Sequence, residues 1–568
     1  MRPVAHLYPS LEERARLLAV AKGKEAPEFV VTGASLADVY TGTWFPANME
    51  IVGERIAYVG PRRPLLAEAT RIFNAEGLWV VPGYIEPHAH PWVLYNPLSL
   101  LEALVPQGVT TVVYDDLLLR MRLDRGSSAH YLSALSELKL PGRLLWAARL
   151  LPQTRLTAEG EEEEFLGEAW NLLDNPWVVS SAEITAWPRI VSGEDRLLRG
   201  IDRALSLGRR AEAHGAGASY ERLVGLAAAG LDADHEAIRP QEVLDRLRLG
   251  FWTMLRWSSL RPDLPSLLPE LPRPLASRLM LTTDGASPSF YEQEGFPALL
   301  TAVSQTGNPL EALQLATLNP ATFLGLDRIL GGLAPGRLAD FLLLEDPESF
   351  QPIQVYLGGR LVAAEGRLVV PLPNWPLSTP PLAFAPAPFG DPQRYQLDAA
   401  PCLRFENAVI TRPASPSGKA IAAWLVDRRG KWRVGAWVED LMPALEGMAT
   451  TFTAAGELLV LGSSPLAMAQ AAEQVVRMGG GFSWVKGTEV VWAQPLPLLG
   501  FMAQGGFAEA ISVEKTLWSL AREAGYSFED ILYTFLFLTC DFLPELRLTP
   551  SGVLEIKKGK VLQRPSPF

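Results

Sequence analysis

Four of the six histidines in this chain of 568 residues follow segments with the pattern of buried strands. In VVPGYIEPHAHP an apolar run ends at Pro-Gly, and His88 and His90 follow two residues apart. If strand geometry continues through them, both imidazoles lie on one face and can hold one metal ion. Alone, such a pair is more often structural or on the surface, so the metal hypothesis needs further ligands.

Further ligands are available after other strand-like segments. His214 follows RRAEA and His235 follows GLDAD, while Glu183 lies near the end of WVVSSAEI and Asp284 ends SRLMLTTD. We expect one metal centre that gathers these side chains with the His-x-His pair. The predicted ligands are His88, His90, Glu183, His214, His235 and Asp284. His6 and His130 have no such setting and are expected on the surface.

This ligand set predicts hydrolytic chemistry. A divalent ion lowers the pKa of bound water, and a carboxylate such as Asp284 can carry the proton to a leaving nitrogen. No lysine occurs between Lys139 and Lys419, which excludes a carboxylated lysine across most of this region and leaves Glu183 to bridge two ions. Imidazole and carboxylate ligands without thiolate suit Zn, Mn or Fe.

The elements that must position these ligands alternate between apolar strand-like runs and amphipathic helices. From residue 81 to 328, runs such as VTTVVYD and WVVSSAEI alternate with helical stretches. This alternation predicts a TIM-type (β/α)8 barrel, whose active sites lie where the strands end. We therefore expect all six ligands to meet at the C-terminal mouth of one barrel.

Segments on both sides of the barrel have a different pattern. Residues 1–80 predict an N-terminal helix and hairpin strands, and residues 329–370 return to strands with turn glycines, so the two segments are expected to form one small β-domain. Residues 371–394 are rich in proline and predict a linker. Residues 395–568 predict a C-terminal α/β domain.

The composition excludes several classes of protein. The net charge of −12 opposes binding to nucleic acid. Cys402 and Cys540 are the only cysteines, so a disulfide framework or a thiolate zinc site is not expected. Without a signal peptide or an apolar span of about 20 residues, we expect a cytoplasmic protein that does not enter a membrane.

The quoted segments resemble the adenine deaminase family of the metal-dependent amidohydrolase superfamily, over nearly the whole chain. The similar stretches include PGYIEPHAH, QGVTTVVYDD, RLMLTTDG and GGLAPGRLADFLLLED, and AEQVVRMGGGFSWVKGTEVVWAQPLPLLGFM resembles the accessory domain of these enzymes. The resemblance implies two divalent ions, with Mn or Fe(II) favoured and Zn possible, and attack of water on C6 of adenine to give hypoxanthine and ammonia. It also implies a homo-oligomer acting on a small molecule.

The resemblance also assigns roles to individual residues. Asp284 would be the main proton shuttle, and Glu236 would contact a ring nitrogen of the substrate. Asp115 matches the aspartate of the Asp-Pro-His-Glu segment of the family, and we carry it as a third catalytic candidate.

The chain departs from the family pattern in three loops. Pro91 to Leu94 replace Ile-Glu-Ser-Ser, residues 116–118 lack the usual histidine and glutamate, and Gly285 and Ala286 replace an acidic-basic pair. We therefore place the chain in a divergent branch whose substrate is larger or less polar than adenine. The expected substrate-binding residues are Trp92, Arg256, Ser258 and Ser259. Structural roles explain the presence of the last three residues equally well: Arg256 can form an ion pair, and the two serines can cap the next helix.

Two alternatives to deamination stay open at this stage. The same ligands support hydrolysis of a cyclic amide or another C–N bond, and the loss of polar loop residues is also expected of a homologue without activity. Release of ammonia distinguishes deamination from ring opening.

Overall fold

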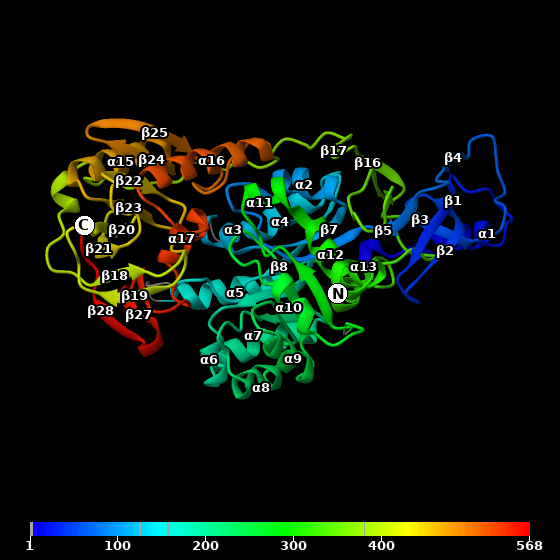
Figure 1. Cartoon of the computed structure of the whole chain (residues 1–568), viewed down its shortest axis with the longest axis horizontal. Coiled ribbons are helices and arrows are strands. Elements are labelled where there is room, and N and C mark those ends of the chain that lie inside the picture. Colours follow the sequence, from blue (N-terminus) through cyan, green and yellow to red (C-terminus); the bar gives the residue numbers. More distant parts are fainter. Residues whose placement is uncertain (1–3, 124–125, 156–159, 276, 380) are drawn as a thin grey trace.

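The computed structural model describes residues 4–123, 126–155, 160–275, 277–379 and 381–568. A small β-domain, a barrel and a C-terminal domain follow one another along the long axis, with the barrel in the centre (Figure 1). The barrel therefore contacts both of the other parts.

Eight parallel strands form the barrel in sequential order. They are β6 (Tyr84–Ala89), β7 (Val109–Asp115), β8 (Arg143–Ala148), β9 (Val178–Ile184), β10 (Arg210–Ala213), β11 (Ala233–Asp234), β12 (Trp252–Arg256) and β13 (Leu279–Thr282). Their residues are almost all buried because helices cover the outside and side chains fill the inside. The predicted (β/α)8 fold is confirmed.

The helices of the barrel follow the strands that they cover. They are α2 (Pro97–Leu104), η2 (Val105–Gln107), α3 (Leu117–Arg122), α4 (Ser128–Ser136), α5 (Glu161–Leu173), α6 (Trp187–Val191), α7 (Asp195–Ser206), α8 (Tyr220–Ala228), α9 (Pro240–Arg248), α10 (Leu264–Leu267), η3 (Leu268–Glu270), α11 (Pro288–Gln293), α12 (Gly295–Thr306), α13 (Pro309–Ala316) and α14 (Leu318–Phe323).

Side chains close the barrel between its first and last strands. Thr282 Oγ1 lies within hydrogen-bonding distance of both His88 O, at 2.8 Å, and Glu86 Oε1, at 2.7 Å, and Thr283 N donates to Glu86 Oε2 at 2.8 Å. Burial raises the pKa of Glu86 to about 7, although these bonds oppose the shift. The closure fixes the strand that carries His88 beside the loop that carries Asp284.

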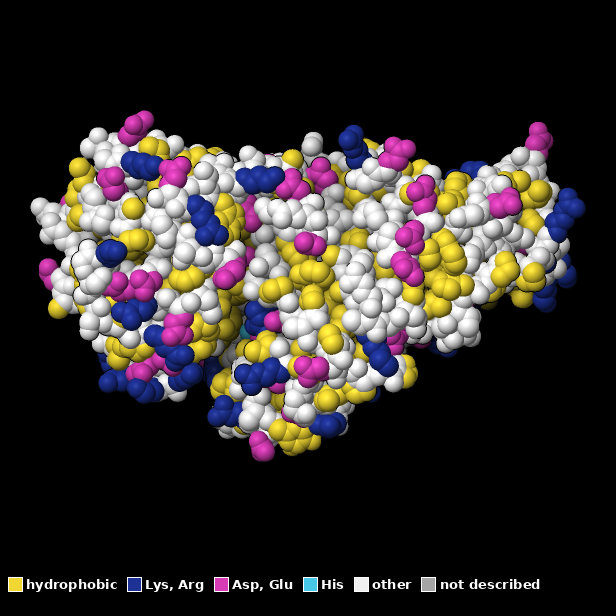
Figure 2. Space-filling view, in the orientation of Figure 1, with side chains coloured by type: hydrophobic (Ala, Val, Ile, Leu, Met, Phe, Trp, Pro, Cys, Tyr) yellow, Lys and Arg dark blue, Asp and Glu magenta, His cyan; other side chains and the backbone are white. Residues whose placement is uncertain are grey.

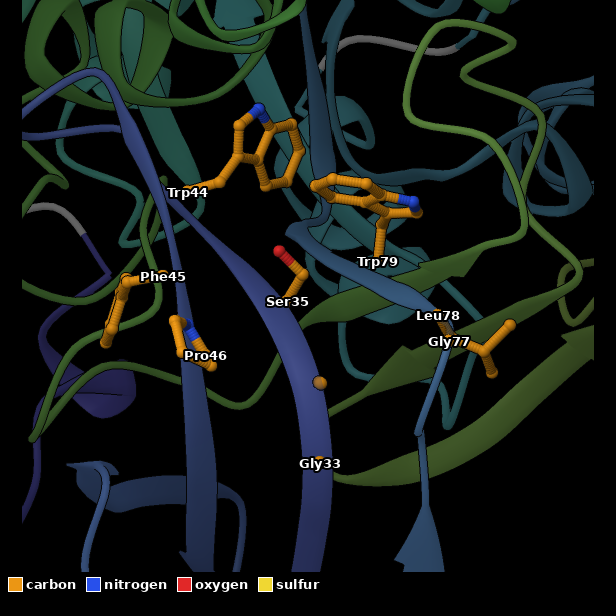
Figure 3. Close-up of a pocket in the computed structure, with 9 residues that line it drawn as sticks. Gly33, Ser35, Trp44, Phe45, Pro46, Gly77, Leu78 and Trp79 are labelled. Carbon is orange, nitrogen blue, oxygen red and sulfur yellow. The ribbon is translucent and has the colours of Figure 1, made fainter.

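The small β-domain pairs strands from both sides of the barrel, as predicted. In its sheet β5 (Trp79–Pro82) pairs antiparallel with β14 (Phe341–Leu344). The other elements are η1 (Ala5–Leu7), α1 (Leu11–Ala21), β1 (Phe29–Asp38), β2 (Thr43–Val52), β3 (Arg55–Gly60), β4 (Arg71–Asn74), β15 (Gln354–Leu357), β16 (Arg360–Ala364) and β17 (Arg367–Leu368). A hollow of about 250 Å³ beside Trp44 and Trp79 contains none of the predicted site residues (Figure 3).

The C-terminal domain contains a nine-stranded sheet, a three-stranded sheet and helices. Its elements are η4 (Pro392–Tyr395), β18 (Cys402–Phe405), β19 (Thr411–Ala414), β20 (Ile421–Val426), β21 (Trp432–Glu439), β22 (Gly447–Thr450), β23 (Leu458–Gly462), α15 (Pro465–Met478), β24 (Gly481–Lys486), β25 (Glu489–Pro495), α16 (Phe507–Glu523), α17 (Ile531–Leu538), β26 (Leu546–Thr549), β27 (Gly552–Glu555), η5 (Ile556–Lys558), β28 (Lys560–Gln563) and β29 (Ser566–Pro567). The described residues between β17 and η4 form neither helix nor strand.

None of the helices in the described part of the chain is long and apolar enough to cross a membrane. His6 and His130 are exposed, as expected from their sequence setting.

Candidate metal centre and substrate pocket

The structure brings all six predicted ligands together where the barrel strands end. His88 and Glu183 lie within the last residues of β6 and β9, and His214 and His235 directly follow β10 and β11. His90 and Asp284 lie in the loops after β6 and β13. Parallel strands end at the same mouth of a barrel, which explains how residues almost 200 positions apart meet.

Distances between side-chain atoms define a compact cluster. Asp284 Oδ1 lies 3.2 Å from His88 Nε2 and 3.3 Å from His90 Nε2. Glu183 Oε2 lies 2.6 Å from His214 Nδ1 and 3.2 Å from His235 Nε2. Glu183 belongs both to a group with His88 and His90 and to a group with His214 and His235, so it can bridge two ions.

Unpartnered buried atoms indicate that this cluster fits a metal. His88 Nε2, His235 Nε2, His214 Nε2 and Asp284 Oδ1 are buried and have no hydrogen-bond partner within the described part of the chain. Leaving buried polar atoms unpaired costs free energy, and a divalent ion would satisfy them. The side chains therefore fit one or two divalent ions held by nitrogen and oxygen.

Asp284 is held as a carboxylate. Burial raises its pKa, but Arg256 first, then His235 and the neighbouring imidazoles of His88 and His90, outweigh burial and hold the pKa well below its ordinary value. Its backbone is left-handed, with φ of 53°. At Gly285, which follows, a Cβ atom would lie 2.6 Å from His90 Cβ, so glycine is required at this departure from the family pattern.

A carboxylate that the sequence analysis missed lies beneath two of the histidines. Glu212 Oε1 accepts from His88 Nδ1 at 2.9 Å and from His235 Nδ1 at 2.8 Å. Both histidines therefore direct Nε2 to the cluster. Although burial raises the pKa of Glu212, its histidine partners lower it to about 2 overall. Its place two residues before His214, on the same face of β10, was the available signal.

Asp115 lies beside a second residue that was missed. Arg149, the first residue after β8, is fully buried and donates to Asp115 Oδ2, to Glu183 Oε1 and, at 3.1 Å, to Glu183 O. Asp115 Oδ1 accepts from Leu117 N at 2.6 Å. Asp115 is not among the residues that line the cavity, so the geometry favours a structural role through Arg149.

Arg256 connects the two remaining catalytic candidates. Its Nη1 donates to Glu236 Oε1 and to Asp284 Oδ2, both at 2.6 Å. Its Nε and Nη2 have no hydrogen-bond partner among the residues described. Arg256 therefore forms the ion pair considered as its alternative role, and it also lines the cavity.

A cavity opens above the cluster. On the barrel side its lining includes Trp92, Gln153, Arg256, Ser258 and Arg261. The C-terminal domain supplies Val409, Tyr533, Phe537, Phe542 and Leu543. In the space-filling view a histidine is visible in the furrow between the C-terminal domain and the helices α6 to α9 (Figure 2). The cavity therefore lies between two domains.

The serines of the expected substrate loop have different positions. Ser258 lines the cavity, and its Oγ accepts from Arg261 N at 3.3 Å. Ser259 is outside the lining, and its Oγ accepts from Ser287 N, at the N-cap of α11, at 3.0 Å. Ser258 remains a candidate for substrate contact, whereas the geometry of Ser259 supports a structural role.

Two family models match the chain. The amidohydrolase family matches residues 79–362, and the adenine deaminase C-terminal domain matches residues 403–560. Together they cover the barrel, its pairing with the small sheet and most of the C-terminal domain.

Relatives extend over almost the whole chain. Proteins from Halalkalibacterium halodurans and Bacillus subtilis, both provisionally named adenine deaminases, are each 32% identical over 96% of this chain and 96% of their own. The adenine deaminase from Deinococcus deserti is 32% identical over 97% of this chain and 98% of its own. The solved structure of an adenosine deaminase from Xanthomonas campestris with bound zinc covers 61% of this chain and 95% of its own, with 14% identity and a TM-score of 0.45.

Proposed function

Because this chain belongs to the adenine deaminase family of amidohydrolases, we propose that it deaminates adenine or a related amino-heterocycle. Membership of this family means that the protein is a hydrolase that acts on C–N bonds other than peptide bonds. The observation that carries the proposal is the convergence of unpartnered histidine nitrogens and Asp284 Oδ1 around Glu183, at the base of a cavity. The products would be hypoxanthine and ammonia from adenine and water.

The metal centre would hold two divalent ions, with Mn or Fe(II) favoured and Zn possible. The ligands would be His88, His90, Glu183, His214, His235 and Asp284. When bound, such ions lower the pKa of water and polarise the ring carbon under attack. Glu212 and Arg149 hold three of these ligands in place through hydrogen bonds.

Asp284 would move the proton. Arg256 holds Oδ2 of Asp284, which leaves Oδ1 directed at the histidines. A carboxylate in that position can accept a proton from the attacking water and deliver it to the leaving amino nitrogen. Glu236, held by Arg256 and lining the same cavity, would contact a ring nitrogen.

Unpaired polar atoms of the cavity suit a heterocycle with both donors and acceptors. Trp92 Nε1 is a free donor and Gln153 Oε1 a free acceptor among the residues that the structure describes. A buried donor and acceptor discriminate strongly against ligands that leave them unpaired. An aminopurine offers an exocyclic amine and ring nitrogens to such groups.

Ammonia release from adenine by protein loaded with Mn or Fe(II) tests the proposal. We expect release by the wild type and a loss of at least about a hundredfold in kcat for Asp284→Asn, with metal content measured in both. If the protein opens the ring of a cyclic amide and releases no ammonia, the alternative hydrolysis is correct and deamination is wrong. Two bound ions without turnover of purines or amides would indicate a homologue without activity.

A further inference from the structure

The C-terminal domain forms one wall of the cavity, although none of the chemistry proposed above uses it. Its contribution comes from α17 and the loop that follows, with Tyr533, Phe537, Phe542 and Leu543, together with Val409. Apart from the Tyr533 hydroxyl this wall is apolar. The groups able to hydrogen-bond a substrate lie on the barrel side.

We propose that this wall is the surface on which a planar substrate ring stacks, with Phe542 and Phe537 as its contacting rings. The inference rests on the proposed function, since it names the part of the site that selects a flat heterocycle. The C-terminal domain would then determine which substrates reach the metal centre.

Ring geometry places Phe542 directly beside the metal centre. Its ring centroid lies 5.2 Å from that of His214, with an interplanar angle of 78°. Phe537 meets Phe542 at 5.7 Å and 80°. Both phenylalanines keep exposed surface while they line the cavity. Partly exposed aromatic rings beside a polar centre favour a ligand with a π-face of its own.

Hydrogen bonds hold this wall in register with the barrel. Asp541 N donates to Gln153 O at 3.1 Å, and Arg155 N donates to Asp541 Oδ2 at 2.8 Å. The side chain of Gln153 in turn donates to Glu183 Oε1 at 3.3 Å. The residue before Phe542 is therefore tied to the loop that contacts the bridging carboxylate.

A second anchor lies on α17. Tyr533 Oη donates to Gly285 O at 2.5 Å and lies 3.4 Å from Asp284 O. The helix that carries Phe537 thus also contacts the loop that carries the proton shuttle. One anchor ends on the loop of Gln153, which contacts Glu183, and the other ends on Gly285, which follows Asp284. Both anchors therefore hold the wall against segments that contact or carry predicted ligands.

Phe542→Leu and Phe537→Leu test the inference, with Phe528→Leu as the matched control. Phe528 is a half-buried phenylalanine of the same domain that packs on Phe405 and Tyr526, outside the cavity. The readouts are equilibrium binding of adenine and hypoxanthine, KM and kcat for ammonia release, and metal content. Stacking of a base on an aromatic ring predicts binding weakened about 5- to 100-fold in Phe542→Leu, with metal content unchanged.

The outcomes separate this inference from the proposed reaction. If hypoxanthine binding weakens in Phe542→Leu and recovers in Phe542→Trp, the stacking role of the wall is supported. The absence of ammonia release in the same experiments would contradict only the proposed reaction. If the wild type deaminates adenine, but Phe542→Leu and Phe537→Leu bind the ligands with the same affinity and have the same KM as Phe528→Leu, the stacking role of the wall is wrong and the proposed reaction is retained. Failure of the wild type to bind any planar heterocycle would overturn the wall.

Discussion

At the scale of single residues, the site depends on a carboxylate, Glu212, that does not line the cavity. Glu212 accepts a hydrogen bond from Nδ1 of two histidines on different strands, so both imidazoles are fixed with Nε2 facing the cluster. Carboxylates in this position orient metal ligands and raise their basicity. The orientation of two predicted ligands therefore depends on a carboxylate that is not one of the six.

Glu212→Gln is expected to weaken metal binding. A neutral amide oxygen accepts the Nδ1 hydrogens of His88 and His235 less strongly than a carboxylate, so metal affinity should fall about 10- to 100-fold. Titration with a competing chelator and determination of metal content measure the effect without any assay of activity.

Glu311→Gln is the matched control for this substitution. Glu311 is a buried carboxylate that pairs with Arg273 and accepts from Leu275 N, outside the cluster. The Glu311→Gln variant should be less stable than the wild type and should bind metal with the same affinity. Equal metal affinity in Glu212→Gln and the wild type would contradict the role assigned to Glu212.

The gathering of the six candidate ligands was predictable from the sequence, whereas the residues that support them were not. A histidine or acid at the end of an apolar run carries a local signal, and all six candidates gather at one mouth. Arg149 has no such signal, and Glu212 has only its place two residues before His214, because the function of both depends on partners that only barrel closure brings near. Whether each of the six residues binds metal stays a prediction.

At the scale of elements, helix α17 presents part of the apolar wall, and a buried aspartate begins it. Asp530 is the N-cap of α17, and its Oδ1 accepts from Tyr533 N at 3.1 Å. Oδ2 has no hydrogen-bond partner among the described residues. Burial raises the pKa of Asp530 to about 7, although the bond from Tyr533 opposes the shift.

This raised pKa predicts a loss of stability as pH rises. Between about pH 4 and pH 7 the folded state keeps a proton that the unfolded state releases, so the free energy of unfolding falls, by up to about 1.4 kcal/mol per pH unit from this group. Asp530→Asn retains a capping oxygen and removes the titration. In urea unfolding at pH 5 and pH 7.5, the free energy of unfolding of Asp530→Asn relative to that of the wild type should be higher at pH 7.5 than at pH 5.

Asp202→Asn, on the exposed surface of α7, provides the comparison for this experiment. The free energy of unfolding of Asp202→Asn should follow that of the wild type at both pH values, because the substitution lies on the exposed surface, away from α17. If the free energy of unfolding changes with pH in Asp530→Asn as it does in the wild type, Asp530 is already ionised in the folded protein and the prediction is wrong.

At the scale of the whole molecule, the pocket exists because two domains dock. Asn96 Nδ2 donates to Ala503 O at 3.0 Å, and Arg122 donates to Gly456 O at 2.6 Å and to Thr451 O at 3.0 Å. The sequence predicted both domains from their patterns of strands and helices. It carried no signal for Phe542 beside His214, since docking between domains has no local pattern. A homo-oligomer and a cytoplasmic location stay predictions.

Asn96 allows docking to be weakened without disturbing the helix that it begins. Its Oδ1 caps α2 by accepting from Leu98 N and Ser99 N, while its Nδ2 reaches the C-terminal domain. Asn96→Asp keeps an equally good cap and places a carboxylate oxygen against Ala503 O. We expect a loss of about 1–3 kcal/mol in the free energy of unfolding, because a buried carbonyl loses its donor.

Calorimetry and binding of hypoxanthine measure the consequences of weakened docking. Asn308→Asp is the control, since Asn308 caps α13 through Glu311 N and is exposed. If docking completes the pocket, only Asn96→Asp should lower the transition temperature of the C-terminal domain and weaken hypoxanthine binding together. A loss of stability with unchanged binding would show that the pocket withstands a loosened interface, and the wall would then depend on the anchors at Asp541 and Tyr533.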